Sequence, residues 1–128
     1  MSVTVLYVDD SRAMRLAVGK SLKGYDCTVV EAGDGEEGMV VARKERPDVI
    51  MLDLRMPVMD GITMLQHLRS DAELKEIPVV MLTAEASMIE TDEIAALGVS
   101  EYLMKPFAAP ELVEKLGRIV ALRPRPVA

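Results

Sequence analysis

Carboxylates, one lysine and one threonine stand at the ends of short apolar runs, and these side chains are the ones that could do chemistry. One apolar run ends in Asp53, and others end in Asp9 and Asp10, in Thr83 and in Lys105. Three carboxylates within a few Å of one another oppose each other's ionisation, so they require a counter-charge nearby. If the fold brings these run ends together, the residue types predict a site for a hard divalent cation beside an ammonium and a hydroxyl group.

The chemistry that such a site favours is phosphoryl transfer. Mg²⁺ prefers oxygen ligands, so three acids without a nearby histidine favour Mg²⁺ over zinc, and we expect that Mn²⁺ can substitute. A cation, an ammonium and a hydroxyl stabilise charge on the oxygens of a transferring phosphoryl group. The available nucleophile is the carboxylate of Asp53, which would become an acyl phosphate. Each residue taken alone is more simply a strand-end cap or a surface ion pair, but their joint occurrence on four strand ends favours the site.

The spacing of apolar residues predicts the elements that would position these side chains. The stretch 48–53 follows Pro47 and contains an unbroken run of four apolar residues that ends in Asp53, which is typical of a strand buried on both faces of a parallel sheet. Similar runs predict strands over 3–8, 27–32, 78–83 and 101–104. The expected helices span 11–22, 36–45 and 88–97, with another between Asp60 and the polar loop 70–76 and a last one whose apolar stripe comprises Leu112, Val113, Leu116, Ile119 and Val120.

Strands that alternate with helices over short loops are parallel and joined by right-handed crossovers. We therefore predict an α/β domain of three layers, with a five-stranded parallel sheet and five helices. The carboxyl ends of parallel strands share one edge of the sheet, which is where ligands bind in such folds.

Length and composition set the class of protein. The 128 residues fit one domain, which we expect to cover 1–122, with 123–128 as a tail or the start of a linker. A net charge of −6 argues against nonspecific nucleic-acid binding. No apolar stretch reaches membrane-spanning length, and a single cysteine, Cys27, fits a reducing cytoplasm as an inert core residue. We expect a cytoplasmic protein that neither inserts into membranes nor binds nucleic acid directly.

Four motifs together resemble the receiver domains of bacterial two-component response regulators, over nearly the whole chain. The motifs are Tyr7-Val8-Asp9-Asp10-Ser11, the run from Asp53 to Gly61 (DLRMPVMDG), Leu82-Thr83-Ala84, and Tyr102-Leu103-Met104-Lys105-Pro106-Phe107. The resemblance implies a flavodoxin-like sheet of strand order 2-1-3-4-5. It also implies a signalling switch that catalyses only its own phosphorylation and dephosphorylation.

The resemblance assigns roles to the residues of the metal site. Asp53 would accept the phosphoryl group, and the direct Mg²⁺ ligands would be Asp10, Asp53 and the backbone carbonyl of Arg55. Asp9 would hold the metal through water. Lys105 would contact the phosphoryl oxygens, and its peptide bond to the following proline would be cis.

The resemblance also implies a switch and two kinds of partner. Thr83 would move to hydrogen-bond the phosphoryl group while Tyr102 moves inward, which would reshape the face made by the fourth helix, fifth strand and fifth helix. A sensor histidine kinase or a phosphotransfer protein would donate the phosphoryl group, and a downstream protein would bind the reshaped face. By the same resemblance, Met14 is a candidate for kinase docking.

Two positions flank the acceptor and could tune the switch. Arg55 lies two residues after Asp53, and Glu85 lies two residues after Thr83. They could pair across the pocket mouth, limit the access of water and so set the lifetime of the acyl phosphate. The alternative is an exposed ion pair worth under about 1 kcal/mol.

Two other functions compete with this interpretation. Residues 33–38 match the G-x-G-x-x-G dinucleotide fingerprint, but Asp34, Glu36 and Glu37 already crowd the helix N-terminus where a pyrophosphate would bind. A haloacid-dehalogenase-like phosphatase is the stronger alternative, since it also uses an aspartyl phosphate, Mg²⁺ and a lysine. Such enzymes need a second acid two residues after the nucleophile, where this chain has Arg55, which cannot act as a general acid.

Overall fold

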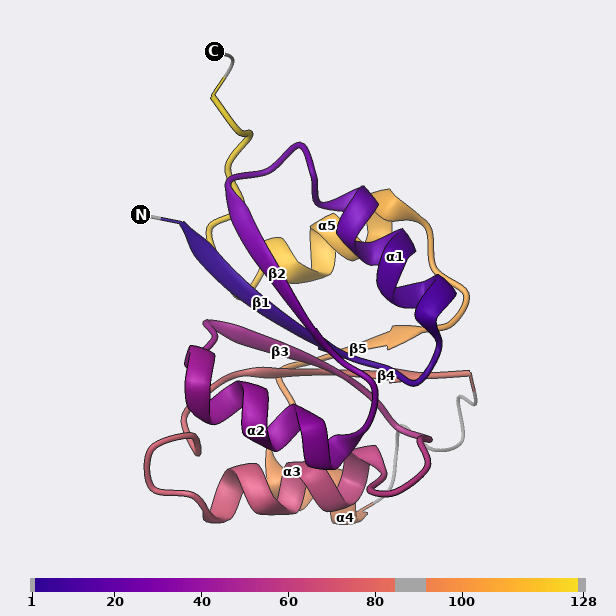
Figure 1. The fold of residues 1–128 in the computed structure, drawn as a ribbon, viewed down its shortest axis with the longest axis vertical. Helices are drawn as coiled ribbons and strands as arrows, with labels where there is room; N and C mark the ends of the chain where they lie inside the picture. Colours follow the sequence, from indigo (N-terminus) through magenta and orange to yellow (C-terminus); the bar gives the residue numbers. More distant parts are fainter. Residues whose placement is uncertain (1, 85–91, 127–128) are drawn as a thin grey trace.

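The computed structural model describes residues 2–84 and 92–126 as one α/β domain in which strands and helices alternate (Figure 1). The strands are β1 (Val3–Val8), β2 (Cys27–Ala32), β3 (Val49–Asp53), β4 (Val79–Thr83) and β5 (Glu101–Met104). The helices are α1 (Arg12–Ser21), α2 (Gly35–Glu45), α3 (Gly61–Ser70), α4 (Asp92–Leu97) and α5 (Ala109–Gly117). All neighbouring strands pair in parallel, in the order β2-β1-β3-β4-β5, which confirms the predicted topology.

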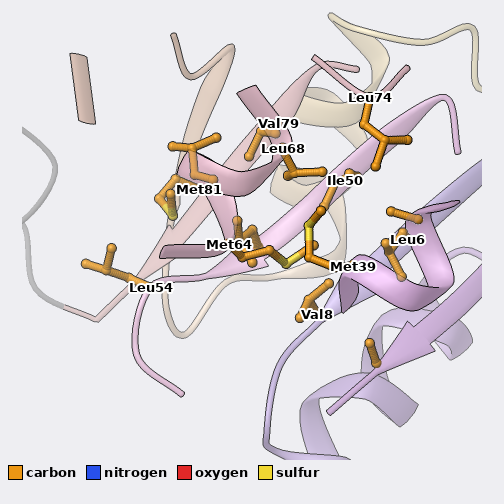
Figure 2. Packing of buried hydrophobic residues seen from close by; sticks show 14 of the residues in the cluster. Leu6, Val8, Met39, Ile50, Leu54, Met64, Leu68, Leu74, Val79 and Met81 are labelled. Atoms are coloured by element: carbon orange, nitrogen blue, oxygen red, sulfur yellow. The ribbon is translucent and has the colours of Figure 1, made fainter. Parts of the chain in front are cut away.

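Helices cover both faces of the sheet, as Figure 1 shows, with α1 and α5 on one side and α2, α3 and α4 on the other. Every residue of β3 and β4 is buried as a result, which explains why these strands are continuous apolar runs. In a core with few aromatic residues, methionines fill the space beneath α2 and α3. Met39 and Met64 lie against strand residues such as Val8 and Ile50 (Figure 2).

Polar caps mark where the three helices that follow β1, β2 and β3 begin. The side chains of Ser11, Asp34 and Asp60 each accept a hydrogen bond from the backbone N–H three residues later. Because each cap satisfies a helix N–H group that has no partner within the helix, the loop before it is held in one conformation.

The last helix is shorter than predicted. It ends at Gly117, so Ile119 and Val120 lie beyond it, although they still pack beside the buried Leu112 and Leu116. The apolar stripe continues because the turn after α5 folds back on the same core, so the helical spacing alone does not mark the end of the helix. The predicted helix 88–97 is described only as α4, since residues 88–91 lie outside the described residues.

Other predictions can be compared directly with the structure. Cys27 is buried, as predicted for a core residue. Among the described residues, no helix is long and apolar enough to cross a membrane. Arg123 and Arg125, from the predicted tail, hydrogen-bond to the loop between α1 and β2.

Candidate functional site

The carboxyl ends of four strands bring the predicted chemical groups to one edge of the sheet. Carboxylate oxygens of Asp9, Asp10 and Asp53 lie within 4.8 Å of one another. Lys105 Nζ lies 2.7 Å from Asp9 Oδ2 and 3.2 Å from Asp53 Oδ2. The lysine therefore bridges two of the acids, and the predicted convergence of these residues is confirmed.

The register of the sheet explains how residues distant in sequence meet. Asp53 pairs with Leu82, and Thr83 pairs with Met104 in the next strand, so each strand places its last residue near the same edge. A pocket of about 180 Å³ at this edge is lined by Asp53, Leu54, Arg55, Thr83, Ala84 and Lys105. Asp53 thus faces an opening of a size suited to a small group such as phosphate.

Asp9 is fully buried, and among the described residues its carboxylate accepts hydrogen bonds from Tyr7, Ser11 and Lys105. Its Oδ1 accepts the Ser11 N–H at 2.9 Å, and its Oδ2 accepts the Tyr7 hydroxyl at 2.8 Å together with Lys105 Nζ. Burial would raise the pKa of Asp9, but the hydrogen bonds from Lys105, Ser11 and Tyr7 outweigh it and hold that pKa below its ordinary value. Asp9 is therefore an anion deep in the site.

Asp53 is also buried, but its ionisation is opposed. Burial and the neighbouring charge of Asp9 raise the pKa of Asp53 to about 6, and Lys105 offsets only part of that increase. For Lys105 itself, burial would lower the pKa, but the hydrogen bond to Asp9 and the charge of Asp53 raise it instead. Lys105 is therefore an ammonium, and Asp53 is the acid of the pair that takes up a proton more readily.

Two residues of the site have no role predicted from the sequence, although Tyr7 stands in the first motif. Tyr7 lies on β1 and Asp9 directly follows that strand, so the alternation of side chains points both to the same face of the sheet, and the buried hydroxyl donates to the acid. Arg15 of α1 donates from its guanidinium to the Asp9 carbonyl at 2.6 Å and to Glu31 Oε1 at 3.1 Å. The available signal for Tyr7 is that a buried tyrosine hydroxyl needs a partner.

The remaining predicted residues occupy varied positions. Arg55 is exposed and lines the pocket, whereas Glu85 lies outside the described residues, so their pairing stays a prediction. Tyr102 is partly buried on β5 and packs against the core beneath α3 and α4. Met14 packs partly against the opposite core. The Lys105-Pro106 peptide bond is cis, as the resemblance implies.

The glycine-rich turn before α2 is occupied by its own acids. Asp34 Oδ1 accepts the Glu37 N–H at 2.9 Å, and Glu37 Oε1 accepts the Gly33 N–H at 3.2 Å. These carboxylates take the N–H groups that a pyrophosphate would need, which agrees with the rejection of the dinucleotide interpretation.

The donor set fits Mg²⁺. It consists of carboxylate oxygens from Asp9 and Asp53, which are buried, and from Asp10, which is exposed to water. Mg²⁺ is usually bound by one or two carboxylates with several waters, so Asp10 and Asp53 are the residues suited to hold it. Its positive charge would also relieve the repulsion that raises the pKa of Asp53.

The strand order, with acids and a lysine gathered at the carboxyl edge, defines a flavodoxin-like α/β domain built around one aspartate. The family model for the response regulator receiver domain matches residues 5–117. The chain belongs to this receiver-domain family.

Two curated relatives and one solved structure illustrate what the chain is similar to. Chemotaxis protein CheY-3 of Vibrio cholerae is 41% identical over 120 residues, which cover 92% of each chain. The response regulator MprA of Mycobacterium ulcerans is 39% identical over 91% of this chain, but only 49% of MprA is covered. The solved structure of CheY4 of Vibrio cholerae superposes with a TM-score of 0.87 at 37% identity, covering 94% of this chain and all of that one. These similarities give the phosphatase alternative no support.

Proposed function

We propose that this receiver domain is a Mg²⁺-dependent switch that accepts a phosphoryl group on Asp53. The observation that supports this most directly is the position of Lys105 Nζ, 3.2 Å from Asp53 Oδ2 and 2.7 Å from the buried Asp9. The ammonium lies where negative charge would develop on a phosphoryl group that reaches Asp53. Asp9 holds the ammonium in that position.

The proposed reaction is a transfer between two nucleophiles. An oxygen of Asp53 attacks the phosphorus of a phosphohistidine, the new O–P bond forms, and the N–P bond breaks with its electron pair returning to the imidazole. Lys105 turns from the Asp53 carboxylate to the incoming phosphoryl oxygens. Asp10, Asp53 and the Arg55 carbonyl would hold Mg²⁺, with Asp9 acting through a water, and the metal would supply positive charge to the phosphoryl oxygens. The acyl phosphate is later hydrolysed, which restores Asp53.

The switch is proposed to pass through Thr83 and Tyr102. Thr83 is the last residue of β4, and its side chain points to the same face of the sheet as that of Met81, two residues earlier. Met81 is in register with Tyr102 on β5. Both side chains therefore belong to the face of the sheet that α4 covers. When the Thr83 hydroxyl turns to the phosphoryl group, it leaves space into which Tyr102 can move, which changes the α4, β5 and α5 surface.

This function implies partners and a place of action. A sensor histidine kinase or phosphotransfer protein supplies the phosphoryl group in the cytoplasm, and a downstream protein binds the altered surface. Residues 1–122 are proposed as the receiver and 123–128 as its tail.

The pairing of Arg55 with Glu85 is proposed to slow hydrolysis of the acyl phosphate. Equal dephosphorylation rates in wild type, Arg55→Ala and Glu85→Ala would contradict this proposal.

The test of the function is the intact mass of the protein after incubation with acetyl phosphate. With Mg²⁺ present, we expect the protein to gain the mass of one phosphoryl group. With a chelator in place of Mg²⁺, we expect no gain in mass. Asp53→Asn should gain nothing under either condition. A gain that survives this substitution, or continuous hydrolysis of phosphate esters by the wild type, would contradict the proposal.

A further inference from the structure

The loop between β3 and α3, residues 54–60, begins directly after the acceptor and includes Arg55. The first residue of α3, Gly61, packs against the start of this loop, and its N–H donates to the Leu54 carbonyl at 3.0 Å. The direction of the Asp53 side chain depends on the peptide between Asp53 and Leu54. The contact with Gly61 is therefore a contact with the backbone that aims the acceptor.

Gly61 has no room for a side chain, and the atoms that exclude one are backbone atoms. A Cβ at this position would overlap the Asp53 carbonyl oxygen and lie 2.9 Å from Leu54 Cα. Real Cβ atoms are not found at such distances, and a backbone atom cannot rotate away as a side chain can. A methyl group here must displace either α3 or the carboxyl end of β3.

The other end of the loop is held in a similar way by α2. The N–H of Gly35 donates to the Met59 carbonyl at 3.0 Å, and a Cβ at Gly35 would lie 2.6 Å from that oxygen. Within the loop, Val58 adopts a φ of 68°, a left-handed conformation that is unfavourable for a β-branched residue. The surrounding contacts thus hold the loop in a conformation that its own residues do not favour.

A third glycine shows the contrast. Gly38 lies one turn further along α2, and a Cβ there would meet Met64 Sδ and Cε at 2.8 Å. Those atoms are the end of a flexible side chain, which can move without shifting the backbone. A methyl at Gly38 therefore disturbs packing, whereas a methyl at Gly61 disturbs the acceptor strand.

We propose that Gly61 is a positioning residue for phosphoryl transfer, because its lack of a side chain lets α3 press against the Asp53-Leu54 peptide and aim the acceptor. This inference rests on the proposed function of Asp53. Displacing that peptide would change the position of the Asp53 carboxylate and of the backbone that leads to Arg55. Both belong to the proposed Mg²⁺ ligand set, so metal binding and phosphorylation should fail together.

The experiment compares wild type, Gly61→Ala and Gly38→Ala. Calorimetry gives the dissociation constant of Mg²⁺ for each unphosphorylated protein. The phosphorylation rate is measured with acetyl phosphate as donor at saturating Mg²⁺, and thermal unfolding gives the stability. For Gly61→Ala we expect Mg²⁺ affinity to fall roughly tenfold, as for the loss of a group that orients metal ligands. We expect the rate at saturating metal to fall by about 10- to 100-fold, as for a misplaced reacting group. Gly38→Ala should lose thermal stability while keeping both values.

The outcomes separate this inference from the function on which it rests. Wild-type affinity and rate in a folded Gly61→Ala protein would overturn the inference and leave the function intact, and so would equal losses in Gly38→Ala. If Gly61→Ala does not fold, Gly35→Ala takes its place, with a reduced Mg²⁺ affinity expected relative to Gly38→Ala in the same helix. Equal affinities in those two variants would overturn the inference. A wild type that binds no Mg²⁺ and takes up no phosphoryl group would overturn the function and the inference together.

Discussion

At the scale of residues, the charge of Asp9 opposes the ionisation of the neighbouring Asp53. Asp9 has a lowered pKa and Asp53 a raised one, although both are buried and both contact Lys105. The difference arises because the charge of Asp9 opposes the ionisation of Asp53, whereas Asp9 also accepts hydrogen bonds from Ser11 and Tyr7. The residue that would react is thus the one whose charge the protein stabilises less.

This conflict predicts that the metal-free protein is stabilised when Asp53 is replaced by Asn. A raised pKa means that the folded state binds the proton more tightly than the unfolded state, so the contribution of Asp53 is favourable below about pH 4 and is lost as pH rises through about 6. In urea unfolding with a chelator at pH 8, Asp53→Asn should be more stable than wild type by roughly 1 to 3 kcal/mol. The difference should shrink towards pH 4 and on addition of Mg²⁺. An equal difference at both pH values would contradict this origin.

The hydroxyl of Tyr7 should contribute measurably to stability. Tyr7→Phe keeps the ring but removes a 2.8 Å hydrogen bond to the buried, ionised Asp9. A hydrogen bond to a charged group is worth more than a neutral one, so we expect a loss of about 1 to 3 kcal/mol in the free energy of unfolding at pH 7. Tyr25→Phe, at a tyrosine outside the cluster, is the matched control. Equal effects of the two substitutions would mean that the bond to Asp9 has no special strength.

At the scale of elements, the sequence predicts strands more reliably than helix ends. The strands β3 and β4 are recognisable because burial on both faces makes them continuous apolar runs. The end of α5 is not, because Ile119 and Val120 continue the apolar spacing after the helix has stopped. The site acids follow from strand ends, but the Tyr7 bond depends on side-chain direction within the fold. The left-handed Val58 likewise depends on contacts with other elements.

Arg69 joins three elements through backbone carbonyls. From α3 its guanidinium donates to Leu97 and Gly98 at the end of α4, and to Lys75 and Ile77 before β4, at 2.7 to 3.0 Å. Arg69→Ala should lower the free energy of unfolding by about 2 kcal/mol, since two part-buried and two exposed hydrogen bonds to carbonyls are lost. Amide exchange at the end of α4 should accelerate more than exchange in β1.

Arg69→Lys is the control for charge alone. A lysine keeps the positive charge but lacks the planar fork of donors, so we expect only partial recovery of both measurements. Full recovery by lysine would show that charge, rather than the set of four hydrogen bonds, secures α4.

At the scale of the whole molecule, the segment that holds Arg123 and Arg125 packs against the loop between α1 and β2. The Asp26 N–H donates to the Arg123 carbonyl at 2.7 Å, and the Arg125 N–H donates to the Gly24 carbonyl at 2.8 Å. The Arg125 side chain also donates to the Lys23 and Cys27 carbonyls. The segment therefore contacts the start of β2, which is an edge strand of the sheet.

This contact predicts a local effect of Arg125→Ala. Loss of the side-chain bonds should loosen the segment, lower stability by roughly 1 kcal/mol and speed amide exchange at Asp26. Arg123→Ala is the matched control, because Arg123 contributes its backbone carbonyl to the contact. Equal exchange at Asp26 in wild type and Arg125→Ala would show that the arginine side chain does not hold the segment.

We propose that Asp53 accepts the phosphoryl group, so the most direct test is to locate that group. The protein is treated with acetyl phosphate and Mg²⁺, the acyl phosphate is reduced with borohydride, and the peptides are mapped by mass spectrometry. Reduction converts a phosphorylated aspartate to homoserine, and we predict this change at Asp53 and at neither Asp9 nor Asp10. Homoserine at either of those two acids, or an unmodified Asp53 in protein that has gained phosphoryl mass, would contradict the account.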